Sequence, residues 1–171
     1  HEAAAHRVSS KIPSSGSAGR SDREAKSGRG EHRVGTLIGE RYHLLEQLGA
    51  GGFGTVYKGY DPLIKRPVAL KLLNQRLLEG VDGALRVEEF TREAALAASI
   101  RHPNIVTVYD LGFHGTPPRP FIVMEFLAGI SLSEELQRAG PIETSRLLRL
   151  MIPALDGLGE AHRNGLVHRD L

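Results

Sequence analysis

Short runs of apolar residues that alternate with polar ones dominate the middle of the chain and predict β-strands. Glycine and proline residues separate these runs, as expected for the turns of an antiparallel sheet. The five predicted strands cover residues 42–48, 55–60, 67–73, 105–111 and 120–126. The first three follow one another closely, which predicts a meander of antiparallel neighbours.

One predicted helix lies between the third and fourth strands. Val87, Phe90 and Ala94 recur at intervals of three and four residues, which predicts a helix over residues 87–99. Pro103 follows shortly afterwards, where a residue that cannot continue a helix is expected. This part of the chain therefore predicts a five-stranded sheet accompanied by one helix.

The pattern becomes helical after the last predicted strand. Ser131 and Glu134 form a capping-box pattern, which predicts a short helix that runs to Arg138. A longer helix is predicted over residues 143–164, and Gly165 follows it where a C-terminal glycine is expected. Its apolar stripe consists of Leu147, Leu148, Met151, Leu155, Leu158 and His162.

Composition narrows the class of protein. With 40% hydrophobic and 25% charged residues, the 171-residue chain has the composition of a soluble globular protein. The net charge of +2 argues against a nucleic-acid partner, and the absence of cysteine excludes disulfides and thiolate zinc sites. No apolar run is long enough to span a bilayer, and we expect a cytoplasmic location, with any membrane anchor outside this chain. Residues 1–38 are rich in Ser, Gly and Arg and lack aromatic residues, which predicts a disordered tail.

A glycine-rich segment stands between the first two predicted strands. Residues 49–54 read Gly-Ala-Gly-Gly-Phe-Gly, in which the backbone can approach an anionic phosphate without side chains in the way. A dinucleotide-binding fold would require a helix after the loop, but the alternating run that begins at Thr55 predicts a strand. Taken alone, the segment is equally compatible with a glycine-rich hairpin that binds no ligand.

Four further motifs follow this loop in a fixed order. Val56 extends the loop pattern, and the segment Val-Ala-Leu-Lys ends at Lys71, 15 residues later. His-Pro-Asn-Ile-Val occupies residues 102–106, residues 121–127 read Phe-Ile-Val-Met-Glu-Phe-Leu, and His-Arg-Asp-Leu occupies residues 168–171. In this order the motifs match the protein-kinase signature set. The chain resembles the eukaryotic-like serine/threonine protein kinases, and most closely their bacterial branch.

The resemblance implies an α+β fold of two lobes. A small N-terminal lobe with a five-stranded antiparallel sheet and one helix would span residues 39–124, and a hinge would span residues 125–130. Residues 131–171 would begin an α-helical C-terminal lobe. We expect this kinase domain, residues 39–171, to be incomplete, since the motif that ends at Leu171 stands in the middle of the family's catalytic domain.

The resemblance also implies an ATP site. The glycine-rich flap would close over the phosphates, and Phe53 at its tip would cap the site. Lys71 would contact the α- and β-phosphates. The residues that the resemblance assigns to ATP are Leu48, Gly49, Ala50, Gly51, Gly52, Phe53, Gly54, Val56, Ala69, Lys71, Met124, Glu125 and Leu127. Within this set Leu48, Val56 and Ala69 would sandwich the adenine, Met124 would be the gatekeeper, and Glu125 and Leu127 would offer backbone hydrogen bonds.

Two carboxylates complete the implied catalytic set. Lys71 would pair with a glutamate of the helix over residues 87–99. Four glutamates compete for this role: Glu79, Glu88, Glu89 and Glu93. The resemblance favours Glu93, because it precedes His102 by nine residues as the family's glutamate does, and because it follows Phe90 by three residues, which would place it on the same inward side. Asp170 would accept the proton of the substrate hydroxyl.

The implied activity is transfer of phosphate from Mg-ATP to Ser or Thr hydroxyls of protein substrates. The magnesium ligands are expected beyond Leu171, and no metal site is predicted within the chain. We therefore expect the chain by itself to be inactive and its apolar stripe over residues 143–164 to be partly exposed. A non-catalytic nucleotide-binding or scaffolding module is the main alternative, and a small-molecule kinase of the same fold is a second.

Overall fold

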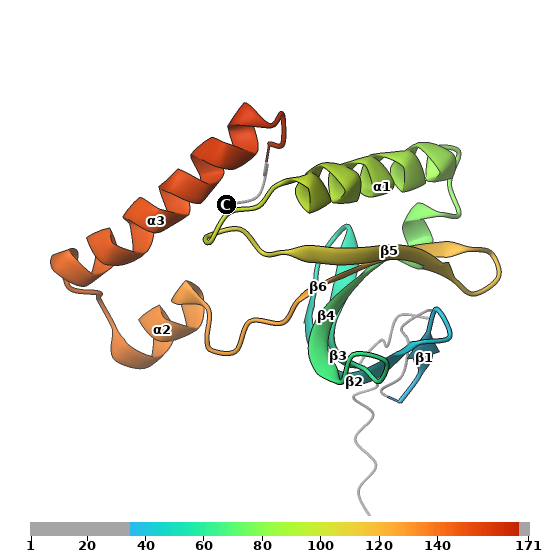
Figure 1. The fold of residues 1–171 in the computed structure, drawn as a ribbon, viewed down its shortest axis with the longest axis horizontal. Coiled ribbons are helices and arrows are strands. Elements are labelled where there is room, and N and C mark those ends of the chain that lie inside the picture. Colours follow the sequence, from blue (N-terminus) through green and yellow to red (C-terminus); the bar gives the residue numbers. More distant parts are fainter. Residues whose placement is uncertain (1–34, 168–171) are drawn as a thin grey trace, which may run out of the picture.

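A single antiparallel sheet of six strands forms the centre of the structure, a computed structural model that describes residues 35–167 (Figure 1). Its strand order is β1-β2-β3-β4-β6-β5. The strands are β1 (Leu37–Ile38), β2 (Tyr42–Ala50), β3 (Gly54–Asp61), β4 (Arg66–Leu73), β5 (Val108–His114) and β6 (Arg119–Glu125). Strands β2, β3 and β4 form the predicted meander, and β6 lies between β4 and β5.

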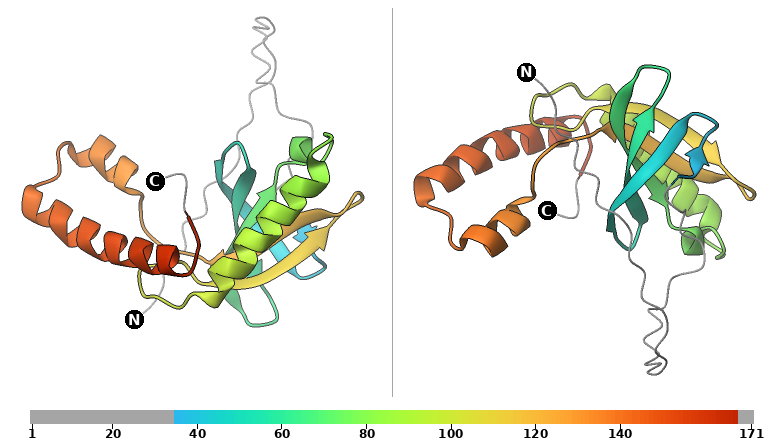
Figure 2. Two further views of the ribbon diagram at one scale, coloured as in Figure 1. Left: turned by 90° about the horizontal axis from the view of Figure 1, so that it is seen from above. Right: turned by 90° about the horizontal axis from the view of Figure 1, so that it is seen from below.

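One long helix packs on the sheet, and two further helices lie beyond one end of it. A 3-10 helix, η1 (Gln75–Leu77), leads into α1 (Gly83–Ser99), which packs against β5 and β6. Helices α2 (Leu132–Ala139) and α3 (Thr144–Arg163) follow β6 and extend beyond one end of the sheet (Figure 2). Within the described residues, no helix has the length and apolar character needed to cross a membrane.

Two apolar clusters on opposite faces of the sheet form the core. Because neighbouring residues of a strand point to opposite faces, β4 contributes to both. One cluster contains Ile38, Tyr42, Leu44, Tyr57, Val68, Leu70, Leu72, Phe121 and Val123. The other contains Leu73 and Ile122 of the sheet with Phe90 and Ala94 of α1. Lys71 and Ala69 share the face of Leu73, so they lie on the side of the sheet where α1 packs.

The five predicted strands are confirmed, and the structure adds β1 to them. The tail assigned to residues 1–38 therefore ends too late, because Ile38 is fully buried in the core and pairs with Tyr42. An isolated apolar pair between two glycines has no periodicity from which a strand can be predicted. Residues 1–34, for which disorder was predicted, lie outside the described residues.

The fourth strand was predicted too early, at residues 105–111, and the structure places it at Val108–His114. Gly112 lies just beyond the predicted end of this strand. Instead it lies inside β5 opposite Phe121, where an added Cβ would lie 2.6 Å from the ring. Glycine is present there because an aromatic ring occupies the space of a side chain, which is a different reason from turn formation.

The two C-terminal helices begin and end close to their predicted positions. Ser131 caps α2 with the reciprocal hydrogen bonds of a capping box to Glu134. Apolar residues of α3 are exposed, as expected for this chain: Leu147 and Met151 keep 37% of their surface accessible, and Leu155 keeps 58%. Only Gly157 and Ala161 of this helix are buried. This part of α3 lies against the segment between α1 and β5. An added Cβ at Gly157 would lie 3.0 Å from the carbonyl oxygen of Asn104, and the carboxylate of Asp156 lies 3.2 Å from the His102 ring.

Candidate active site

The glycine-rich segment forms the tip of the hairpin between β2 and β3. A strand follows the loop, as predicted, and the amide of Gly51 closes the turn by donating to the carbonyl of Gly54 (2.9 Å). The ring of Phe53 at the tip is 62% exposed, and Leu48 on β2 is 46% exposed. The hairpin therefore presents its backbone and two apolar side chains to a potential ligand.

The glycines of this loop are present for two different reasons. At Gly54 an added Cβ would lie 2.5 Å from the carbonyl oxygen of Leu72, so the pairing of β3 with β4 requires glycine there. At Gly49 and Gly52 an added Cβ would meet nothing within 4 Å. Neither packing nor a left-handed backbone explains glycine at those two positions. Glycine at these two positions leaves room for a ligand to approach the backbone closely.

Lys71 lies directly beside this loop. In the sheet it is paired with Val56 on one side and with Ile122 on the other, and cross-strand partners share a face. Its Cγ lies 3.7 Å from the position that a Cβ of Gly54 would take. Its ammonium group lies 5.9 Å from the centre of the Phe90 ring. The structure thus brings a half-buried cation next to the glycine-rich turn.

Apolar residues predicted to surround the adenine lie on the same face of the sheet as Lys71. Ala69 is paired with Met124 across β4 and β6, and Val56 is the neighbour of Lys71 on β3. Ala69 is 6% exposed, whereas Val56 and Met124 are partly buried. Together they form a flat apolar surface that can bind an aromatic ring.

The predicted hinge begins where β6 ends. The amide of Glu125 donates to the carbonyl of Thr107 (2.9 Å), so this amide is already engaged within the chain. Leu127 lies two residues beyond β6 in a segment without regular structure and is 62% exposed. Both residues therefore follow Met124 closely along the chain, and their backbone hydrogen bonds to adenine stay a prediction.

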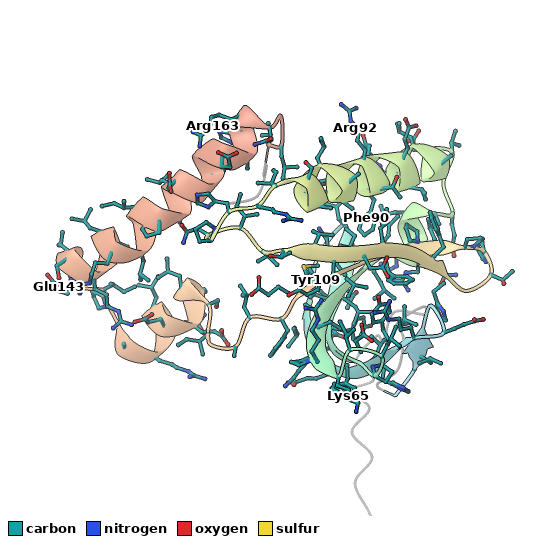
Figure 3. The ribbon with its side chains drawn as sticks, in the orientation of Figure 1. Lys65, Phe90, Arg92, Tyr109, Glu143 and Arg163 are labelled. Atoms are coloured by element: carbon teal, nitrogen blue, oxygen red, sulfur yellow. The ribbon has the colours of Figure 1, made fainter. Side chains whose placement is uncertain are left out.

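Glu93 does not lie where the sequence predicts it. It is exposed, and no ion pair within residues 35–167 joins it to Lys71. Phe90 points from α1 toward the sheet and Arg92 points away (Figure 3). Ala94 fills the second buried position of the helix, and Glu93 is turned by about 100° from it. The prediction of an inward-facing Glu93 is wrong for this conformation.

The other glutamates considered do not replace it. Glu79, Glu88 and Glu89 are also exposed, and Glu89 pairs with Arg86 (2.9 Å). Pairing of Lys71 with Glu93 in a nucleotide-bound conformation therefore stays a prediction.

The predicted catalytic aspartate, Asp170, lies outside the described residues, together with the rest of its motif. Residues 35–167 contain no group of three His, Cys, Asp or Glu side chains that could hold a metal ion.

Sequence reasoning overlooked Asn74, the first residue after β4. Its side-chain amide donates to the carbonyls of Gly51 (2.7 Å) and Gly52 (2.9 Å). The only signal in the sequence is a polar residue after an apolar strand, which is too common to predict a specific contact.

The strongest electrostatic perturbations lie away from this site, around Tyr42 on the opposite face of the sheet. The guanidinium of Arg41 donates to both carboxylate oxygens of Asp61, at 3.1 and 2.7 Å, and Asp61 is almost fully buried. Burial is the largest effect on Asp61 and opposes ionisation, but hydrogen bonds from Arg41 and from backbone amides lower its pKa overall. Burial, and the hydrogen bond that Tyr42 donates to Asp110 (2.6 Å), raise the pKa of Tyr42.

Comparison with known proteins shows one consistent similarity. The family described as protein kinase domain matches residues 42–171. The probable serine/threonine-protein kinase pknA2 of Bifidobacterium longum is 40% identical over 142 residues, which cover 82% of this chain and 18% of that protein. The serine/threonine-protein kinase PknB of Mycobacterium tuberculosis is 39% identical over 136 residues, 78% of this chain and 21% of that protein. The chain thus spans about a fifth of the length of the curated relatives it matches.

Solved structures give the same result for the fold. The crystal structure of the M. tuberculosis PknI kinase domain matches with a TM-score of 0.68 and 26% identity, covering 82% of this chain and 55% of that one. The structure described as PpkA-294 in its apo form matches with a TM-score of 0.68 and 25% identity, covering 82% of this chain and 55% of that one. The chain therefore corresponds to about half of each of these solved chains.

Proposed function

Since this chain belongs to the protein kinase domain family, we propose that the protein containing it is a serine/threonine kinase that transfers phosphate from ATP to protein hydroxyl groups. The observation that supports this proposal most is the placement of Lys71. Strand pairing places its side chain on the same face of the sheet as Val56. The adjacent glycine-rich turn has open space where a Cβ of Gly49 or Gly52 would lie. A cation beside exposed backbone amides is suited to bind a polyphosphate.

The described residues account for ATP binding in two parts. The phosphates bind under the hairpin tip, where Gly49 and Gly52 leave room for close approach and Lys71 supplies positive charge. The adenine packs on the apolar surface of Val56, Ala69 and Met124, and the carbonyl of Glu125 accepts a hydrogen bond from its amino group. Met124 adjoins this surface as the gatekeeper.

Phosphoryl transfer requires groups beyond the ATP-binding surface. Asp170 accepts the proton of the substrate hydroxyl while the hydroxyl oxygen attacks the γ-phosphorus. The bond from the γ-phosphorus to the bridging oxygen breaks, and ADP leaves with that oxygen. Glu93 positions Lys71 once a rotation of α1 has turned the Glu93 side chain toward β4. Magnesium, which the family uses together with ATP, neutralises charge on the phosphates when bound.

In this proposal the 171-residue chain by itself transfers no phosphate. It covers 55% of the PknI kinase-domain chain that it matches. Activity is therefore expected of the whole protein only.

A radiolabelled-ATP assay with a generic basic protein substrate tests the proposal. We expect transfer by the full-length protein, a loss on the order of a hundredfold in Lys71→Ala, and a comparable or larger loss in Asp170→Asn. Lys65→Ala is the matched control, because Lys65 is an exposed lysine in the turn between β3 and β4 (Figure 3).

Near-normal transfer in Lys71→Ala would refute the assignment of that residue. ATP binding by the full-length protein without any transfer would favour the non-catalytic alternative. Transfer by the 171-residue chain at the rate of the full-length protein would show that the metal site has been placed wrongly.

A further inference from the structure

Asn74 makes three hydrogen bonds to the glycine-rich loop and a fourth to Thr55 directly after it, although about 20 residues separate these partners from Asn74 in the sequence. Its side-chain nitrogen donates to the carbonyls of Gly51 (2.7 Å) and Gly52 (2.9 Å). Its side-chain oxygen accepts from the hydroxyl of Thr55 (3.3 Å), and its backbone amide donates to the carbonyl of Phe53 (3.0 Å). Both N–H groups and the oxygen of the Asn74 side-chain amide are therefore hydrogen-bonded to the hairpin of β2 and β3.

Strand pairing holds the two ends of the glycine-rich loop: Gly49 is paired with Val56, Ala50 with Thr55 and Gly54 with Leu73. The turn is closed by the single hydrogen bond from Gly51 to Gly54, and residues 49–53 are exposed. A glycine-rich segment has high conformational freedom, so holding it in one conformation requires specific contacts. At the tip of the loop, residues 51–53, Asn74 supplies three such contacts.

The position of Asn74 links this contact to the nucleotide site. It follows Lys71 by three residues, at the end of the same strand, and Lys71 adjoins Gly54 at the other end of the loop. In the proposed nucleotide site, β4 therefore positions both the backbone of the glycine-rich loop, through Asn74, and the ammonium group of Lys71. Any movement of the loop away from β4 separates these two groups.

We propose that Asn74 is a positioning residue that holds the glycine-rich loop against the end of β4 before nucleotide binds and thereby sets nucleotide affinity. The part that concerns affinity rests on the proposed function, whereas the part that concerns the loop does not. A loop held in its binding conformation loses less entropy when ligand binds, so its affinity is higher than that of a loop free to move.

Two substitutions separate hydrogen bonding from shape. Asn74→Ala removes all side-chain hydrogen bonds to the loop. Asn74→Asp keeps the shape almost unchanged but places a carboxylate, which cannot donate when ionised, against the carbonyls of Gly51 and Gly52. Asn164→Ala is the matched control, because Asn164 also donates two hydrogen bonds, to Glu160 at the distant end of α3.

The first measurement is amide hydrogen exchange of the 171-residue chain, followed at Gly51 and the neighbouring loop amides. Loss of two hydrogen bonds at an exposed site corresponds to about a tenfold change in the open population. We therefore expect exchange at Gly51 to be about tenfold faster in Asn74→Ala and at least as fast in Asn74→Asp, with no change in Asn164→Ala. Unchanged exchange in both Asn74 variants would overturn the proposal, and wild-type exchange in Asn74→Asp alone would reduce Asn74 to a space-filling role.

The second measurement is calorimetric titration of the full-length protein with ATP and magnesium. We expect a dissociation constant about tenfold higher in both Asn74 variants and unchanged in Asn164→Ala. Equal or tighter binding in Asn74→Ala would show that the anchored loop does not favour nucleotide, which overturns the effect on affinity. If the wild-type protein binds no ATP, the proposed function fails, and hydrogen exchange still decides whether Asn74 anchors the loop.

Discussion

Alanine at two glycines of the same loop is expected to give opposite results. In Gly54→Ala the new Cβ would lie 2.5 Å from the carbonyl oxygen of Leu72, whereas ordinary contacts begin near 3.4 Å. The neighbour is backbone in the centre of the sheet, so it cannot move aside as a flexible side chain can. Overpacking of this kind costs about 1–3 kcal/mol of unfolding free energy.

Gly49→Ala meets no atom within 4 Å. Its effect on the unfolding free energy is therefore expected to stay within about 0.5 kcal/mol. If the amide of Gly49 approaches a phosphate, however, the new methyl group stands in the way of that approach. We expect the dissociation constant for ATP to rise by about tenfold or more, the change that 1.4 kcal/mol produces.

Thermal unfolding followed by circular dichroism, combined with ATP titration, separates the two effects. At about 2–8 °C per kcal/mol for domains of this size range, the midpoint of Gly54→Ala should fall by several degrees or more. That of Gly49→Ala should not change measurably. If Gly49→Ala lowers the midpoint as much as Gly54→Ala does, both glycines are structural and the argument for a phosphate site fails. A stable Gly49→Ala variant with wild-type ATP affinity would refute the argument equally.

Two further predictions concern stability and surface. Burial opposes ionisation of Asp61, but hydrogen bonds from Arg41 and the Leu63 amide outweigh it and lower the pKa of Asp61 in the folded state. The contribution of ionised Asp61 to the free energy of unfolding is therefore complete above about pH 4, near the pKa of an unfolded aspartate. It is lost as the pH falls through the pKa of Asp61 in the folded state. Urea unfolding at several pH values should show a flatter acid limb in Asp61→Asn than in wild type or in the exposed control Glu88→Gln; parallel acid limbs would contradict this. The exposed stripe of α3 should bind the dye ANS, and Leu147→Glu combined with Leu155→Glu should reduce the fluorescence at unchanged helix content. Undiminished fluorescence would place the dye site elsewhere.

Local patterns were sufficient for most of the secondary structure and for the order of the motifs. The alternation after Thr55 predicted a hairpin rather than a dinucleotide-binding turn, because the side-chain period of a strand is visible in a few residues. The capping box at Ser131 needs only four residues and was confirmed. The motif order, from the glycine-rich loop to residues 168–171, identified the family.

The sequence by itself determined most of the segments that form strands and helices and the order of the motifs that mark the family, because these are patterns of residues close together in the sequence. Only the tertiary structure decided which residues meet. The burial of Ile38, the ring of Phe121 over Gly112 and the hydrogen bonds from Asn74 to the loop all depend on register between distant segments. Glu93 shows the same limit, since the packing of Phe90 and Ala94 sets the rotation of α1, and a difference of about 100° separates a buried position from an exposed one.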